Sequence, residues 1–116
     1  FKIVYGNTSF LFTGDAESVS ENYLVNRYGN FLKSDVLKVG HHGSTSSSSP
    51  MFIKTVNPKY SLISAGKNNR FNHPSDLVIS RLSLIKSEIF RTDEEGAVIL
   101  QSDGKQITKI NWKNKN

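Results

Sequence analysis

The sequence predicts an α/β fold with a mixed sheet, and three observations lead to this class. Short apolar runs of strand length alternate along the chain with segments whose apolar residues recur at helical spacing. Several of the apolar runs end in loops rich in Gly, Ser, Asn and Asp. All three histidines lie in loops that follow predicted strands. Because ligands of α/β proteins bind beyond the ends of strands, a functional site is expected at these loops.

The first half of the chain is predicted to form a hairpin, a helix and a strand. The hairpin turns at Gly6-Asn7, and the helix can be capped by Ser18 or Ser20. The helix should run to about Tyr28, because Gly29 is a natural stop. Its apolar side is predicted to carry Val19, Tyr23 and Leu24. The predicted strands of this half are Phe1–Tyr5, Thr8–Phe12 and Val36–Val39.

The second half is predicted to contain two helices among short strands. Ser49 followed by Pro50 is typical of a helix N-cap and first turn, and this helix should end near Asn57. A longer helix should run from Pro74 to about Ser87. Its apolar residues at i, i+4 and i+7 are Val78, Leu82 and Ile85. The predicted strands of this half are Tyr60–Ser64, Glu88–Arg91, Ala97–Gln101 and Gln106–Trp112.

Composition limits the class of protein. With 116 residues the chain is one domain at most, and because it starts inside a predicted strand we expect it to be a piece of a larger domain. The absence of Cys excludes disulfides and thiolate zinc sites. The net charge of +5 favours anionic partners weakly, since part of it lies in lysines near the C-terminus. The chain shows no apolar run of membrane-spanning length and no targeting signal.

Two neighbouring strand ends carry residues of the kinds that bind metal ions. Asp15 follows one apolar run through Gly14, and His41-His42 follow the next through Gly40. Carboxylate and imidazole together suit zinc, manganese or iron. A single loop His or Asp is more often a surface or turn residue. Adjacent histidines beside a Thr-Gly-Asp segment favour a metal or a phosphate site.

Four motifs stand in a fixed order. They are Thr13-Gly-Asp-Ala-Glu17, Asp35-Val-Leu-Lys-Val-Gly-His-His-Gly-Ser44, Gly66-Lys-Asn-Asn-Arg70 with Asn72-His-Pro74, and Arg91-Thr-Asp93 followed by Gly96. Over about residues 1 to 112 the sequence resembles the metallo-β-lactamase-fold domain of ComEC-type competence proteins. The resemblance implies the C-terminal half of an αββα sandwich, a mixed sheet with helices on one face, followed by a basic tail at 113–116.

One departure from the family pattern concerns the metal ligands. The family's first metal motif, His-x-(His/Asp)-x-Asp-His, lies upstream of the Thr-Gly-Asp segment, and this chain contains no such sequence. The resemblance therefore implies two divalent ions, Zn or Mn, in the full domain and an incomplete site in this chain. A piece with two ligands is expected to hold metal weakly, because zinc usually takes three or four protein ligands.

The resemblance also implies roles for single residues. Asp15 matches the carboxylate that bridges both metals, and His42 matches the last imidazole ligand. The assignment between His42 and its neighbour His41 stays open. The expected catalytic groups are His41, Asp15 and His73, and the expected substrate-binding groups are Glu17, Ser44, Lys67, Asn68 and Arg70. Plain turn, helix-start or loop roles compete with this reading at Asp15, Glu17, Ser44 and His73.

The implied function is hydrolysis of phosphodiesters by water that the metals activate. The resemblance suggests a nuclease domain that degrades DNA during uptake, or a soluble relative similar to phosphorylcholine esterases. A triad of Ser44, His41 and Asp15 is disfavoured, because the Gly-x-Ser-x-Gly elbow is absent. A non-catalytic nucleic-acid-binding or interaction module is the alternative from another class. Reading the upstream segment for the metal motif would separate the two.

Partners and location follow from the same resemblance. The expected partners are nucleic acid or another phosphodiester, the missing N-terminal half of the domain, and a second copy of the chain through an exposed sheet face. The expected location is an extracytoplasmic domain of a bacterial membrane-bound competence protein, or a soluble relative.

Overall fold

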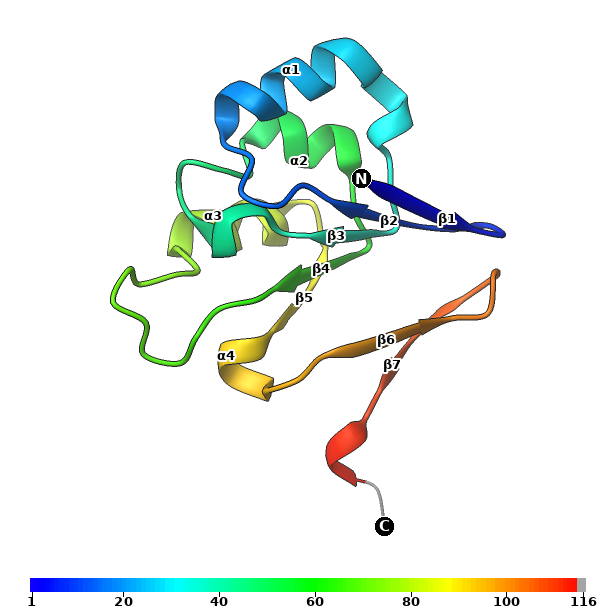
Figure 1. The fold of residues 1–116 in the computed structure, drawn as a ribbon, viewed down its shortest axis with the longest axis vertical. Helices are drawn as coiled ribbons and strands as arrows, with labels where there is room; N and C mark the ends of the chain where they lie inside the picture. Colours follow the sequence, from blue (N-terminus) through cyan, green and yellow to red (C-terminus); the bar gives the residue numbers. More distant parts are fainter. Residues whose placement is uncertain (115–116) are drawn as a thin grey trace.

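A computed structural model of the chain describes residues 1–114. Five strands form one sheet in the order β1-β2-β3-β4-β5, with β1 antiparallel to β2 and the other pairs parallel (Figure 1). This confirms the predicted α/β class and the predicted common sheet. The strands are β1 Lys2–Tyr5, β2 Thr8–Phe12, β3 Val36–Lys38, β4 Tyr60–Ile63 and β5 Glu88–Arg91.

Helices connect the parallel strands, and a hairpin ends the described chain. The helices are α1 Ser18–Tyr28, α2 Pro50–Val56, α3 Asp76–Leu84 and α4 Thr92–Glu95, with 3-10 turns η1 Gly29–Leu32, η2 Gly40–Gly43 and η3 Trp112–Asn114. The hairpin consists of β6 Ile99–Ser102 and β7 Ile107–Ile110. The predicted basic tail at 113–116 begins in η3, and its last two residues lie outside the described residues.

The hydrophobic core lies between one face of the sheet and the first three helices. Because register partners in a sheet point to the same face, Leu11 of β2 and Leu37 of β3 share it. Both are buried with Phe52 of α2 and Val78 of α3 in one cluster. The helices thus cover this face, as the sequence predicts for a half sandwich.

The opposite face of the sheet carries two phenylalanines, a leucine and a lysine, and the core helices α2 and α3 do not cover it. Phe12, Lys38, Leu62 and Phe90 are aligned there by strand register. The β6–β7 hairpin runs past this side (Figure 1). Its Lys109 lies 4.6 Å from the ring centroid of Phe90. The face is therefore bordered by a hairpin, and it is not packed against a second layer of helices within residues 1–114.

Two helix predictions were wrong in detail. Val19 and Tyr23 are 81% and 63% exposed, and the fully buried residue of α1 is Glu21. Leu24, the third residue predicted for the apolar side, does pack against the core. The side of α1 that faces the core therefore carries Glu21 and Leu24 instead of Val19 and Tyr23. The third helix begins at Asp76, because the Ser75 hydroxyl accepts a hydrogen bond from the Val78 amide at 3.3 Å and caps it.

The remaining differences lie at element ends. The third helix stops at Leu84 instead of Ser87, where Lys86 takes a positive φ of 61° that no α-helix continues. The four-residue helix α4 was not predicted, because its sequence Thr-Asp-Glu-Glu carries no apolar periodicity. The strand β6 begins two residues later than predicted.

Candidate metal and phosphate site

Three loops meet beyond the ends of β2, β3 and β4. These strands are parallel, so the loops that follow them leave the same edge of the sheet. The His41 amide donates to the Gly14 carbonyl at 2.9 Å, which joins the first loop to the second. The Ser75 amide donates to the Gly43 carbonyl at 3.0 Å, which joins the second loop to the third. The predicted site residues on these loops are thereby brought into one region.

Two glycines allow the loops to approach so closely. A Cβ on Gly40 would lie 3.1 Å from the Thr13 hydroxyl and 3.3 Å from the Gly14 carbonyl oxygen. Gly43 has φ of +83°, and a Cβ there would lie 2.5 Å from the Cβ of Pro74. A side chain at Gly43 would therefore be strained and would push the third loop away.

Both histidines of the pair have left-handed backbone conformations. His41 has φ 50° and ψ 42°, and His42 has φ 55° and ψ 23°. Such a conformation costs a non-glycine residue about 1–2 kcal/mol, and two in succession persist only when their surroundings hold them. The two ring centroids are 6.5 Å apart. This strained turn aims two imidazoles from adjacent positions at the same edge of the sheet.

His42 is oriented in the way that metal-binding histidines commonly are. Its Nδ1 lies 2.8 Å from the Ser64 carbonyl oxygen. Because a carbonyl can only accept, Nδ1 donates in this contact, and a neutral imidazole held in this way has its lone pair on Nε2. The side chain is exposed, so Nε2 can reach an ion or a substrate.

The other two imidazoles lie beside each other. The ring centroids of His41 and His73 are 6.1 Å apart. The Nδ1 of His41 lies 3.4 Å from the Ser46 hydroxyl. The Nδ1 of His73 is buried and has no hydrogen-bond partner. A polar atom in that position is suited to a proton or to a ligand group that enters the site.

The predicted carboxylates lie at the first loop. Asp15 and Glu17 are both exposed, and Asp15 directly follows the Gly14 carbonyl that binds the His41 amide. Half-buried Lys38, on the sheet face that no helix covers, was not singled out from the sequence. Burial lowers the pKa of Lys38, and the negative charge of Asp15 acts in the opposite direction. A cation inside an otherwise apolar strand run was the signal that could have found it.

The predicted substrate-binding residues differ in whether their polar groups are exposed or already hydrogen-bonded. The side chains of Lys67, Asn68 and Arg70 are exposed on the third loop. Ser44 is buried, its amide donates to the His41 carbonyl, and its hydroxyl lies 3.0 Å from that of Ser46. Both polar groups of Ser44 are therefore engaged inside the loop.

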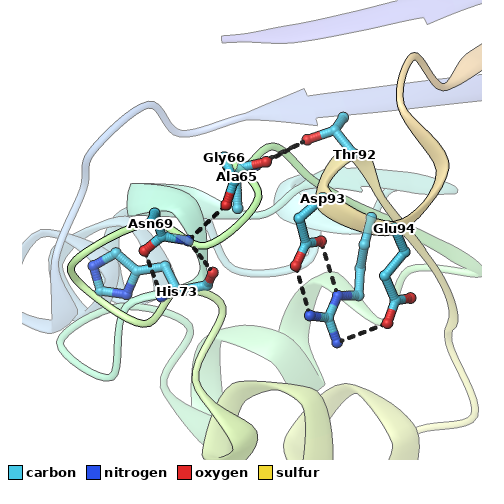
Figure 2. A network of polar contacts seen from close by, with 8 residues as sticks. Ala65, Gly66, Asn69, His73, Thr92, Asp93 and Glu94 are labelled. Atoms are coloured by element: carbon cyan, nitrogen blue, oxygen red, sulfur yellow. Dashed lines mark hydrogen bonds and ion pairs between the residues drawn. The ribbon is translucent and has the colours of Figure 1, made fainter.

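The third loop is held by its own polar contacts and by the first residue of α4 (Figure 2). The Asn69 amide group donates to the carbonyls of Gly66 at 2.9 Å and His73 at 2.6 Å, and its oxygen accepts from the His73 amide at 2.9 Å. The Thr92 hydroxyl donates to the Ala65 carbonyl and accepts from the Ala65 amide. Asn69 thus shapes the loop from within.

Asp93 belongs to the same corner of the fold as the third loop (Figure 2). Both of its oxygens accept from Arg91, at 3.1 and 2.8 Å. These bonds hold the pKa of Asp93 below its usual range. Within the described residues its role is structural, as a partner of Arg91.

A buried carboxylate that the sequence interpretation missed anchors the second loop. Glu21 of α1 is fully buried and accepts from the amides of Ser48 at 2.6 Å and Ser49 at 2.9 Å. The Arg81 guanidinium of α3 donates to the Ser48 carbonyl at 3.1 Å. Together these contacts fix the serine run against two helices.

The chain supplies part of a metal-ligand set. Within residues 1–114 no three His, Asp or Glu side chains are placed to hold one metal ion. The imidazole of His42 and the carboxylate of Asp15 are both exposed and are donors of the kinds that such a set uses. The residues present therefore suit a divalent ion only if further ligands are supplied.

A groove of the described chain lies between β1, β2 and α1, and none of the three histidines lines it. It has a volume of about 730 Å³ and is mostly apolar. Thr13, Gly14 and Lys38 line one part of it, so it borders the loop that carries Asp15. Its aromatic lining residues are Phe1, Phe12, Tyr28 and Phe31.

No helix formed by residues 1–114 has the length and apolar character needed to span a membrane.

Comparisons with known proteins agree with this arrangement. Residues 1–67 match the family model described as the metallo-beta-lactamase superfamily. The chain is 44% identical over 93 residues to "ComE operon protein 3" of Bacillus subtilis, and 40% identical over 97 residues to "Competence protein ComA" of Neisseria gonorrhoeae. It is also 40% identical over 93 residues to "Recombination protein 2" of Haemophilus influenzae.

These matches cover 80%, 84% and 80% of the chain, and 12%, 14% and 11% of the three relatives. The chain thus spans a small part of the length of each relative. The family match, over more than half of the chain, and these identities over most of it show that the chain belongs to the metallo-beta-lactamase superfamily and is similar to its ComEC-type competence members.

Proposed function

We propose that this chain carries one half of the active site of a metal-dependent phosphodiesterase, a nuclease that acts during DNA uptake. Membership of the superfamily supports a hydrolase, and the similarity to competence proteins supports a role in competence. The observation that carries the proposal is the orientation of His42. Its Nδ1 binds the Ser64 carbonyl, which leaves Nε2 free beside the loop that presents Asp15.

The roles proposed for the chain's own residues follow from their positions. Asp15 and His42 would hold divalent metal, which supplies positive charge to polarise a phosphoryl group and activate water. His41 and His73 have rings 6.1 Å apart, so they can hold or pass a proton at the site. Exposed Lys67 would bind phosphate oxygens electrostatically.

The remaining ligands are proposed to come from an upstream segment that carries the metal motif. That segment would cover the apolar groove and the sheet face opposite the helices. The groove supports this proposal, because apolar surface of this kind is costly when exposed and it borders the Asp15 loop. A second copy of the chain is the competing occupant. Sedimentation of the chain alone and mixed with the upstream segment would distinguish a homodimer from a complex of the two halves.

The test compares the 116-residue chain with a polypeptide that also carries the upstream motif. Metal content and hydrolysis of a DNA strand are measured for both. The longer polypeptide should bind metal and cleave, and the chain alone should do neither, because it cannot close the ligand set. Substitutions Asp15→Ala and His42→Ala in the longer polypeptide should abolish cleavage without unfolding it, since both side chains are exposed.

His41→Ala should lower the rate of cleavage more than it lowers the metal content. Glu88→Ala, which removes an exposed carboxylate on β5, is the matched control for Asp15→Ala. Full activity in the chain alone, or an Asp15→Ala variant that still cleaves, would mean that the site has been misinterpreted. Using p-nitrophenyl phosphorylcholine beside DNA separates the nuclease from a phosphorylcholine-esterase-like hydrolase.

A non-catalytic nucleic-acid-binding module is the second candidate. The absence of three clustered metal-ligand side chains within residues 1–114 favours it, as do the exposed cations of the third loop. It predicts salt-sensitive binding of DNA without cleavage, even when the upstream segment is present. Cleavage by the longer polypeptide would exclude it.

The proposed location is outside the cytoplasmic membrane, where incoming DNA would be met. Protease added to intact cells should digest this region, and protection from the protease would refute the location.

A further inference from the structure

The third loop, between β4 and α3, presents an exposed aromatic ring next to the candidate site. Phe71 is 64% exposed, although Phe is usually buried. Its ring stacks on that of His73, with centroids 5.8 Å apart and planes 16° from parallel. The Arg70 guanidinium carbon lies 4.9 Å from the centroid of the same ring. A cation, a phenyl ring and an imidazole thus form an offset stack that leaves 64% of Phe71 exposed.

The loop backbone that carries this stack is held by hydrogen bonds within the described chain. The Asn69 side chain makes three hydrogen bonds within the loop, two of them to the backbone of His73 (Figure 2). The Asn72 amide donates to the Asn69 carbonyl, and Thr92 ties Ala65 to the start of α4. A flat group that binds a preorganised ring loses less entropy than one that must first order the loop.

The stack leads into the histidine cluster. The His73 ring, on which Phe71 lies, is the ring whose centroid is 6.1 Å from that of His41. A flat group on Phe71 would therefore be two ring contacts away from His41. The loop from Ser64 to Ser75 contains Lys67 and Arg70 and no Asp or Glu. The surroundings of the ring thus suit a ligand that combines flat, uncharged rings with negative charge.

We propose that Phe71, supported by Arg70, is a stacking platform for an unpaired base of a single-stranded nucleic acid whose backbone passes the histidine cluster. Aromatic side chains beside cationic groups bind single strands in this way, because every base has a π face. In a duplex both faces of a base are already covered by its neighbours, so the platform favours single strands over duplexes. This inference rests on the proposed function and narrows its substrate.

The experiment measures binding of the 116-residue chain without added metal to three fluorescein-labelled probes of equal length. These are a single-stranded thymidine oligonucleotide, the same strand with abasic residues, and a duplex. Phe71→Leu removes the ring and keeps an apolar side chain, and Phe71→Trp keeps a ring as the matched control. Thermal unfolding of each variant checks that the exposed substitution leaves the fold intact.

Phe71→Leu should weaken binding of the thymidine strand by about 5- to 100-fold, the range expected for one stacked base. Phe71→Trp should bind it at least as well as the unmodified chain, and in a Trp112→Phe background its fluorescence should be quenched by the strand. The abasic strand and the duplex should bind all variants alike. Equal binding of the thymidine strand by the unmodified chain and Phe71→Leu would overturn the proposal, as would an equal loss on the abasic strand.

The binding assay tests the stacking platform independently of the proposed nuclease activity. If the longer polypeptide does not hydrolyse DNA but ring-dependent binding is found, the nuclease proposal falls and the stacking platform stands. If it hydrolyses DNA and the ring has no effect on binding, the platform falls and the nuclease stands.

Discussion

Removing the carboxylate of Glu21 is the most direct test of how the second loop is held. Glu21 is fully buried and accepts from two amides, at 2.6 and 2.9 Å. Each hydrogen bond to a charged group contributes about 1.5–3 kcal/mol, and a buried amide left unpaired costs about 1–3 kcal/mol. Losing both bonds in Glu21→Ala should therefore destabilise the chain by about 3–6 kcal/mol. That is a large share of the 5–15 kcal/mol typical of a whole domain.

Because Glu21→Ala could unfold the chain, Glu21→Gln is the quantitative variant. Gln keeps one acceptor oxygen and points an NH₂ group at the second amide, so a loss of about 2–3 kcal/mol is expected. Urea denaturation at pH 7, followed by circular dichroism, measures it. Asn26→Ala, on the exposed side of the same helix, should change the free energy of unfolding by less than about 0.5 kcal/mol. A loss below about 1 kcal/mol for both Glu21 variants would refute this account of the loop.

Three further predictions concern the neighbouring charges and the third loop. Arg91 holds the pKa of Asp93 below 3.8, so the ionised carboxylate stabilises the fold above that pH and the effect is lost as the pH falls through the lower folded value. Asp93→Asn should cost about 1 kcal/mol at pH 7 and nothing in strong acid, as urea titrations at both pH values would show. Burial lowers the pKa of Lys38 below 10.5. At a pH below this lowered pKa, the buried ammonium group destabilises the fold. This destabilisation disappears once the pH exceeds 10.5, where Lys38 is neutral in the folded and the unfolded chain. Lys38→Met should therefore raise the melting temperature at pH 7, and an unchanged or lower value would contradict this. Asn69→Ala removes three hydrogen bonds and should speed hydrogen exchange at the His73 amide at least tenfold, whereas Lys67→Ala, at an exposed position of the same loop, should not.

Local signals predicted the elements whose ends are set by their own residues. Ser49 and Pro50 start α2 where expected, because the Ser49 hydroxyl accepts from the Phe52 amide and Pro needs no partner for its missing N–H. Gly29 ends α1 with φ of 50°. In each case the deciding interaction spans no more than four residues, which is the range that a sequence pattern records.

Tertiary contacts decided what the sequence pattern could not. The inward side of α1 depends on Glu21, whose partners lie 27 and 28 residues away. A helix of low amphipathicity offers no pattern from which that pairing could be predicted, and a Glu between polar residues predicts an exposed side. The partner of His42 Nδ1 is likewise a backbone carbonyl 22 residues away. Every residue has a backbone carbonyl, so the sequence does not indicate which one His42 contacts.

The convergence of the three loops combines both kinds of information. That Asp15, His41 and His73 follow successive strands was visible in the sequence, and parallel pairing of β2, β3 and β4 then requires their loops to leave one edge. How closely they meet depends on the lack of a side chain at Gly40 and Gly43. The two glycines were visible in the sequence. The residues that pack against them belong to the other two loops, and the sequence does not show which these are. The same reasoning applies to the proposed metal site, because ligands from the proposed upstream segment would have to approach the edge that these loops form.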